Sequence, residues 1–374
     1  MLTLVLVVIL AALVFEFING FHDTANSIAA SVATKVLSPG QAVSLAAVMN
    51  LIGALTGTAV AATIATGLVN TDVVEVTSQL VLCALLGAIV WNLVTWWFGL
   101  PSSSSHALIG GLCGAALAAA HNDWNALIWI QSGADWAHSK GLVWKVLVPM
   151  VTSPLVGFLL GMTLIVLLWA MISGMERAGG LLKRMARPRW INMVFGKMQI
   201  VSAAYMGYAH GHNDAQKTMG IIALTLFGAQ ASGALDDLPA WLGFLHPKAG
   251  AADNEVALWI VITCALVMAA GTASGGWRII KTLGHKMVKL QPLDGFAVDT
   301  SSATVLMAAA HFGMPVSTTH TVSTVIMGVG FAKNPRKLKL GTIERIVWAW
   351  ILTIPAAGGI AYGLLRALEA LGWA

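Results

Sequence analysis

The chain has 374 residues, of which 57% are hydrophobic and only 10% are charged. A transmembrane helix needs roughly 20 apolar residues, and several charge-free stretches are at least that long. These stretches are 41–71, 76–122, 146–175, 256–277, 300–332 and 346–365. The composition therefore excludes an ordinary soluble domain and predicts an all-α polytopic membrane protein.

The net charge of +5 is better explained by the positive-inside rule than by nucleic-acid binding, because the basic residues are clustered. The basic clusters lie in 177–197, 278–289 and 333–345. The acidic clusters lie elsewhere, in 72–75, 123–135 and 236–255. We therefore expect the basic loops in the cytoplasm, the acidic loops outside, and no nucleic acid among the partners.

This orientation threads the segments in chain order. Residues 1–172 are predicted to form a first repeat with an external loop at 122–140; its segments are 2–30, 41–69, 78–98, 101–120 and 141–172. A basic cytoplasmic connector follows at 173–197. Residues 198–374 are predicted to form a second repeat with a long external loop at 231–255; its segments are 198–230, 256–280, 293–312, 315–332 and 343–372. The threading predicts about 10–12 membrane segments.

Two short motifs each occur twice, in the same order. The aspartate motif "GFHDTANS" (20–27) returns as "GHNDAQKT" (211–218), and the proline motif "WFGLPSSSSH" (97–106) returns as "HFGMPVSTTH" (311–320). In the threading, the first aspartate motif enters the membrane from outside, whereas its near-copy enters from inside. This geometry predicts two inverted-topology repeats with broken helices and re-entrant hairpins.

The proline motifs predict helices that begin inside the membrane. A Gly-Leu-Pro or Gly-Met-Pro break is tolerated there only where protein covers it or where it lines a wet cavity. Because proline suits the first turn of a helix, each motif is predicted to place a half-helix N-terminus at a hairpin tip, where free N–H groups attract oxyanions. The hydroxyl groups that would assist belong to Ser103, Ser104, Ser105, Ser317, Thr318 and Thr319. The alternative is that these residues only cap a kinked helix.

Asp23 and Asp214 lie in the two aspartate motifs, at membrane depth. A charged group there costs roughly 2.5–3.5 kcal/mol on insertion scales and usually marks an ion or proton path. The alternative is a carboxylate that only caps a helix or binds neighbouring backbone. Two carboxylates beside an oxyanion repel it unless a cation also binds, or unless a carboxylate or the anion carries a proton. Hydrogen phosphate has an O–H group that could donate to a carboxylate, whereas sulfate has none near neutral pH.

Other polar residues surround these aspartates in the sequence. His22 is either a proton carrier or a neutral hydrogen-bonding group, and Lys217 pairs either with phosphate or with an aspartate. Amide ligands are offered by Asn26, Asn213 and Gln216. Glu16 and Asp299 are further candidates for cation or proton handling, unless Asp299 lies near the membrane surface. No spacing of His or Cys indicates a metal site, so we expect neither a metal nor a cofactor.

The four motifs together resemble the inorganic phosphate transporter (PiT) family, and the resemblance spans nearly the whole chain. It rests on "FHDTANS", "LPSSSSH", "HGHNDAQKTMG" and "MPVSTTH". The resemblance implies inverted repeats and a phosphate site at the hairpin tips. The substrate-binding candidates are then Ser103, Ser104, Ser105, Ser317, Thr318 and Thr319, with Gln216 and Lys217. The candidates for cation or proton coupling are Asp23, Asn26, Asn213 and Asp214, with His22, Glu16 and Asp299.

The pairs His22-Asp23 and Gln216-Lys217 resemble the bacterial low-affinity, proton-coupled branch of that family. This implies a secondary active symporter that imports inorganic phosphate across the bacterial cytoplasmic (inner) membrane, with a proton or sodium ion as the co-transported cation and protons favoured. A divalent cation could travel with the phosphate. The alternatives are a sodium-coupled symporter, a sulfate permease of the same fold and an uncoupled anion channel. No nucleotide-binding Gly-Lys-Ser/Thr motif is present, so we expect no enzyme, and a homodimer is left open.

Overall fold

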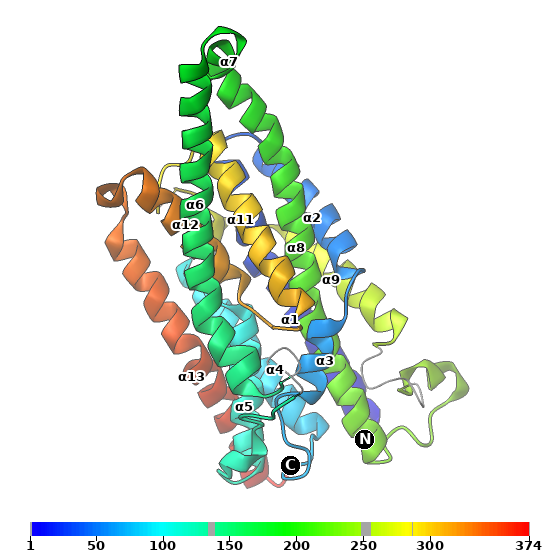
Figure 1. Ribbon diagram of the computed structural model, residues 1–374. Helices are drawn as coiled ribbons and strands as arrows, with labels where there is room; N and C mark the ends of the chain where they lie inside the picture. The colour runs from blue at the N-terminus through cyan, green and yellow to red at the C-terminus, as the bar shows by residue number, and fades with distance from the viewer. Residues whose placement is uncertain (1, 134–138, 248–255, 286, 374) are drawn as a thin grey trace.

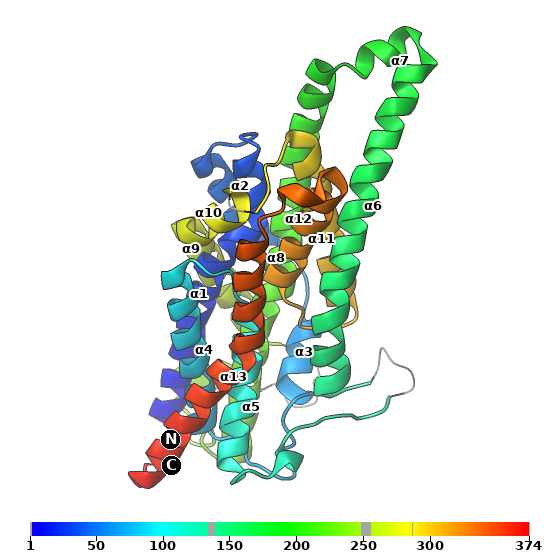
Figure 2. The same cartoon turned by 90° about the vertical axis from the view of Figure 1, so that its left-hand side faces the viewer.

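The computed structural model describes residues 2–133, 139–247, 256–285 and 287–373 (Figure 1). Within these residues the fold is built from helices, and pairing of extended segments is limited to two isolated β-bridges. The helices form an elongated bundle, with both termini near one end and the short helix α7 (Gly180–Met185) at the other (Figure 1, Figure 2). The all-α fold predicted from composition is confirmed.

The helices follow the predicted segments closely. Before α7 they are α1 (Leu2–Ala33), α2 (Pro39–Ala54), α3 (Ala59–Thr66), α4 (Ser78–Phe98), α5 (Ser104–Ala119) and α6 (Val148–Ala178), which a π-helical turn at Val143–Leu147 precedes. After α7 they are α8 (Pro188–Ala231), α9 (Leu258–Ser274), α10 (Trp277–His285), α11 (Pro292–His311), α12 (Thr318–Lys333) and α13 (Leu340–Ala370).

Four helical segments of the described chain are long and apolar enough to cross a membrane. They are α1, α4, Val143–Ala178 and α13. The pairs α2–α3 and α9–α10 bend by 68° and 71° at short breaks and raise the total to six if each pair is one span. Helices α5 and α12 have 16 residues each, about 24 Å, which is less than the roughly 30 Å of a hydrocarbon core. The predicted number of 10–12 membrane segments counted such half-helices and stays a prediction.

Each proline motif folds into a helical hairpin, α4–α5 in one case and α11–α12 in the other. Gly99 and Gly313 follow α4 and α11 with φ of +64° and +62°, in the left-handed region that favours glycine. Ser103 and Ser317 then cap the next helix, because each side-chain oxygen accepts a hydrogen bond of 3.1 Å from the backbone N–H three residues later. The same local structure is therefore built twice.

Helices α1 and α8 cross the bundle in opposite directions. Along α1, the buried residues of a first apolar cluster end at Phe15 and those of a second cluster begin at Ala25. Along α8 the order is reversed, since the second cluster ends at Ala209 and the first begins at Ala215. Each aspartate motif therefore lies in a polar layer between two apolar layers. This order agrees with an inverted arrangement, and the division into repeats at 1–172 and 198–374 stays a prediction.

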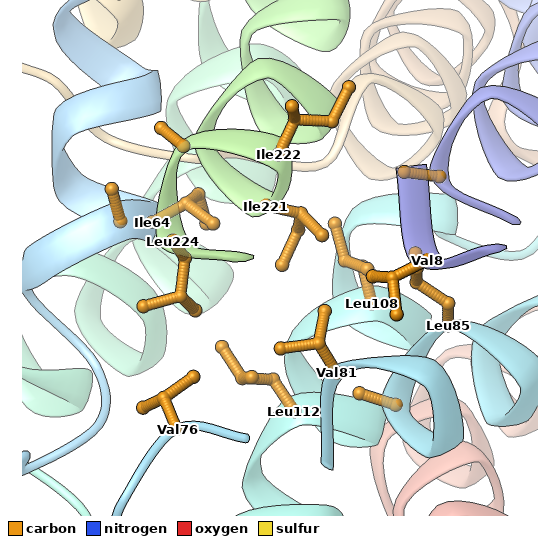
Figure 3. Packing of buried hydrophobic residues seen from close by; sticks show 14 of the residues in the cluster. Val8, Ile64, Val76, Val81, Leu85, Leu108, Leu112, Ile221, Ile222 and Leu224 are labelled. Atoms are coloured by element: carbon orange, nitrogen blue, oxygen red, sulfur yellow. The ribbon is translucent and has the colours of Figure 1, made fainter. Parts of the chain in front are cut away.

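The first apolar cluster joins helices that are far apart in the sequence. Figure 3 shows Val8 of α1, Leu108 of α5 and Ile221 of α8 within it, with Ile64 of α3 beside Leu224 of α8. Burial of such side chains excludes water from this side of the polar layer.

The predicted connector and loops contain more helix than expected. The connector at 173–197 consists of the end of α6, α7 and the start of α8, which project from the bundle (Figure 2). The loops at 122–140 and 231–255 include short 3-10 turns at Trp124–Ala126 and Ala240–Leu245. Residues 134–138 and 248–255, which carry part of the acidic clusters, lie outside the described residues.

Candidate functional site

The tips of the two hairpins meet in the polar layer. The Ser105 hydroxyl lies 3.5 Å from the carbonyl oxygen of Val316, and the rings of His106 and His320 are 4.7 Å apart between centroids. From this junction α5 extends toward the end that carries the termini, and α12 extends toward the end that carries α7 (Figure 1, Figure 2). The six hydroxyl residues predicted for the tips are all buried. The N-termini of two half-helices therefore face each other inside the protein.

The tips offer donors for an oxyanion. The first-turn N–H groups of Ser104 and Ser105 in α5, and of Thr318 and Thr319 in α12, have no hydrogen-bond partner among the described residues. The Ser104 hydroxyl is also without a partner within that part of the chain. Free N–H groups and the positive ends of two helix dipoles attract negative charge. This arrangement is suited to a small tetrahedral oxyanion.

We call the N-terminus of α5 the first tip and the N-terminus of α12 the second tip. The aspartate motif of α1 lies against the second tip. Asp23 Oδ1 is 2.7 Å from Nδ1 of His22 and 3.5 Å from the Thr319 hydroxyl. The Asn26 side-chain amide donates to the hydroxyl oxygens of Thr318 and Thr319, at 3.2 and 2.9 Å. Asn26 Oδ1 is buried without a partner in the described ranges. An unpaired amide oxygen one helical turn from a carboxylate on the same helix is a possible ligand set for a cation.

The aspartate motif of α8 contacts both tips. Asp214 accepts hydrogen bonds from Asn213 at 2.9 Å and from the Thr318 hydroxyl at 3.1 Å. Lys217 forms an ion pair with Asp214 and donates to the Ser105 hydroxyl and, at 3.1 Å, to the Val316 carbonyl. The sequence left open whether Lys217 pairs with an aspartate or with phosphate, and in this structure it pairs with Asp214.

His210, which the sequence motifs did not single out, lies close to both aspartates. Its Nε2 lies 3.2 Å from Asp214 Oδ2. One ligand atom each from Asp23, His210 and Asp214 lie within 4.8 Å of one another, all buried, so these three residues could hold a cation or share a proton. The spacing of four residues between His210 and Asp214 puts both on one helix face, which is a signal that the sequence does contain. The sequence spacing alone had indicated no metal site.

Asn50 of α2 orients the His210 ring. Its side-chain oxygen lies 3.1 Å from His210 Nδ1, and its amide donates to the Thr272 hydroxyl at 2.8 Å. Nothing in the sequence around Asn50 marks this role, since the contact depends on how α2 packs against α8.

The structure does not bring every predicted residue to the tips. Glu16 is buried on α1, about 10 Å along the helix from Asp23, and accepts a hydrogen bond from Thr218. The Gln216 amide is engaged elsewhere, because it accepts from the Val60 N–H at 2.7 Å and donates to a carbonyl of its own helix. Asp299 lies on α11 about 18 Å before the end of that helix, at His311, and thus well away from the second tip. The proposed roles of these residues stay predictions.

The short half-helices α3 and α10 hold the turns of the hairpins. Thr63 of α3 donates to the carbonyl of Gly313 at 2.7 Å. Thr282 of α10 donates to the carbonyl of Gly99 at 2.9 Å, and the Arg278 guanidinium donates to the carbonyl of Trp97 at 2.7 Å. The turn of the α11–α12 hairpin is therefore held by α3, and the turn of the α4–α5 hairpin is held by α10.

Comparison with known proteins gives matches over almost the whole chain. A family model described as "Phosphate transporter family" matches residues 19–361, which include all four motifs. A relative from Bacillus subtilis (strain 168), named "Probable low-affinity inorganic phosphate transporter", is 40% identical over 369 residues, 98% of this chain and 98% of that protein. A relative of the same name from Rhizobium meliloti (strain 1021) is 42% identical over 355 residues, 94% of this chain and 93% of that protein.

A solved structure named "The sodium-dependent phosphate transporter" is similar in fold. It matches with a TM-score of 0.79 and 23% sequence identity, over 98% of this chain and 99% of that chain. At this identity the likeness supports the arrangement of helices and nothing finer.

Proposed function

The chain belongs to the phosphate transporter family and is thus a transporter rather than an enzyme; from this premise we propose that it is a secondary active symporter for inorganic phosphate. The proposed reaction is import across a bacterial cytoplasmic membrane, driven by a cation gradient, with protons favoured as the coupling ion. The observation that carries the proposal is the pair of half-helix N-termini, whose unpartnered N–H groups face each other in a buried polar layer among the described helices.

The carboxylates beside this anion site support coupling to a cation. Asp23 and Asp214 both contact hydroxyl groups of the second tip, so a bound anion would lie next to two carboxylates, of which Asp214 is paired with the Lys217 ammonium. Without a compensating positive charge, this arrangement repels the substrate. A cation or proton at Asp23 removes the remaining repulsion, which makes anion binding depend on it.

The histidines favour a proton over sodium. One imidazole lies beside each carboxylate, His22 at 2.7 Å from Asp23 and His210 at 3.2 Å from Asp214. Imidazole is the side chain whose ordinary titration falls nearest to neutral pH, so the His22–Asp23 pair, which has no lysine partner among the described residues, offers a place for a transported proton. Hydrogen phosphate also brings a proton that a carboxylate can accept in a hydrogen bond, and this favours phosphate over sulfate.

The apolar layers on both sides of the site favour a carrier over a channel. The motifs lie between the two apolar clusters, and the tip residues are almost inaccessible to solvent. A carrier must open such a site to one side at a time, and broken helices at the midplane are common in carriers. Half-helices α3 and α10 are candidates for this opening, because each holds one hairpin by few hydrogen bonds.

Uptake of radiolabelled phosphate into proteoliposomes tests the proposal. We expect accumulation when a proton gradient is imposed, weaker accumulation under a sodium gradient, and competition by unlabelled phosphate rather than by sulfate. Omission of divalent cations from the buffer tests whether a metal travels with the phosphate. An uptake rate and final accumulation that do not change with either imposed gradient would contradict symport and favour an uncoupled channel.

A further inference from the structure

Lys217 takes the place of an asparagine when the two aspartate motifs are aligned. Asp23 and Asp214 are 191 positions apart, and so are Asn26 and Lys217. The residue three positions after the aspartate is thus an amide in one motif and an ammonium in the other.

The contacts of the two residues also correspond. Asn26 donates to the Thr319 hydroxyl of the second tip at 2.9 Å, and Lys217 donates to the Ser105 hydroxyl of the first tip. Ser105 and Thr319 occupy equivalent positions of the proline motifs. Each aspartate motif therefore contacts one tip through its third residue after the aspartate.

The oxygen atoms around the Lys217 ammonium are of the kinds that bind a hard cation. They are a carboxylate oxygen of Asp214, the hydroxyl of Ser105 and the carbonyl of Val316. Lys217 is only 2% exposed, so its charge is balanced inside the protein. Carboxylate, hydroxyl and carbonyl oxygens are also the ligands that proteins supply to such ions.

The corresponding position in α1 has no positive group of this kind. The Asn26 amide donates to the Thr319 hydroxyl, which also lies 3.5 Å from Asp23 Oδ1, and the Asn26 side-chain oxygen is left without a partner within the described residues. The two related positions therefore differ in one respect. In α8 the protein supplies an ammonium, and in α1 it supplies a carboxylate and an amide oxygen, with the His22 imidazole beside the carboxylate.

We infer that the Lys217 ammonium is a tethered cation that replaces a mobile cation at the α8 position. Only the position around Asp23 and Asn26 is then left for a coupling cation from solution. The inference rests on the proposed function and deepens it, since Lys217 determines how many cations accompany the substrate and which kind. Asp214 keeps its positive partner throughout transport, so no solute cation is needed there.

The substitution Lys217→Asn tests this directly, because it puts an amide three residues after Asp214, as Asn26 stands three residues after Asp23. Purified variant and wild type are heated in sodium chloride and in an equal concentration of choline chloride. We expect sodium to raise the melting temperature of Lys217→Asn by several degrees more than that of the wild type, since a bound ion stabilises the folded state. Lys217→Met is the matched control, because it has similar length but no oxygen ligand, and it should not gain a response to sodium.

Failure of Lys217→Asn to fold is covered by a second variant. Lys217→Ala leaves the three oxygens without a cation, and methylammonium should restore its folded yield and melting temperature, whereas Lys217→Met should not respond. A sodium response of Lys217→Asn no larger than that of the wild type overturns the inference, as does a lack of rescue of Lys217→Ala when Lys217→Asn does not fold. These measurements involve no transport, so wild-type uptake under imposed gradients tests the proposed function separately.

Discussion

The hydroxyl of Ser104 allows substrate binding to be separated from folding. Ser104 is the first residue of α5, and its hydroxyl is buried at the junction of the tips without a partner in the described chain. Ser102, two residues earlier in the same tip, is equally buried, but its hydroxyl donates to Thr95 Oγ1 at 2.7 Å. The account predicts opposite effects for Ser104→Ala and Ser102→Ala.

The size of the effect follows from the missing hydrogen bond. A hydrogen bond to a charged group contributes about 1.5–3 kcal/mol, and about 1.4 kcal/mol is a factor of ten in affinity. Loss of one bond between Ser104 and phosphate should therefore raise the half-saturation concentration about 10- to 150-fold. Stability should be unchanged or slightly higher, because alanine removes a buried polar atom that has no partner in the described structure.

Ser102→Ala should show the reverse pattern. It removes a hydrogen bond within the protein, so the free energy of unfolding should fall by about 0.5–1.5 kcal/mol while the half-saturation concentration stays nearly the same. The assays are initial rates of phosphate uptake in proteoliposomes and thermal unfolding of the purified proteins. If Ser104→Ala transports with wild-type half-saturation, or if Ser102→Ala weakens substrate binding more than Ser104→Ala does, phosphate does not bind at this tip as reasoned.

Asp23→Asn should abolish concentrative uptake while the protein still inserts into the membrane, because an amide cannot balance the charge of a coupling cation. Asp214→Asn should also abolish it, because the buried Lys217 ammonium loses the carboxylate that pairs with it. Full accumulation by either variant would refute the role of that aspartate. Gly114→Ala should destabilise the protein by about 1–3 kcal/mol or more, since a Cβ there would lie 2.1 Å from the Gly358 carbonyl oxygen and force α5 away from α13. Gly359→Ala is its control, because a Cβ at that position meets open space. Equal melting temperatures for the two glycine variants would contradict the close packing of these helices.

The features that could be predicted from the sequence are those that depend on a few adjacent residues. The Gly-x-Pro breaks at Gly99 and Gly313 predict two helices that begin inside the membrane, because backbone geometry there depends on a few adjacent residues. Repetition of both motifs predicts that the two tips are related, and the structure brings the tips together.

The parts that sequence could not supply depend on packing between distant helices. His210 is four residues from Asp214, yet its link to Asn50 of α2 exists only because α2 packs on α8. Gln216 lies inside the motif but uses its amide to hold α3, so membership in a motif did not determine its contacts. The bends after α2 and α9 lack a proline, and the glycines at these breaks, Gly57, Gly275 and Gly276, mark an interruption but do not determine its angle.

A structure with arsenate tests the central claim most directly, because arsenate has the shape and charge of phosphate and its anomalous scattering locates the arsenic atom. The account predicts one peak between the N-termini of α5 and α12, with the arsenate oxygens about 3 Å from the backbone nitrogens of Ser104 and Thr318. A peak elsewhere in the protein, with these nitrogens bonded to water alone, would contradict it.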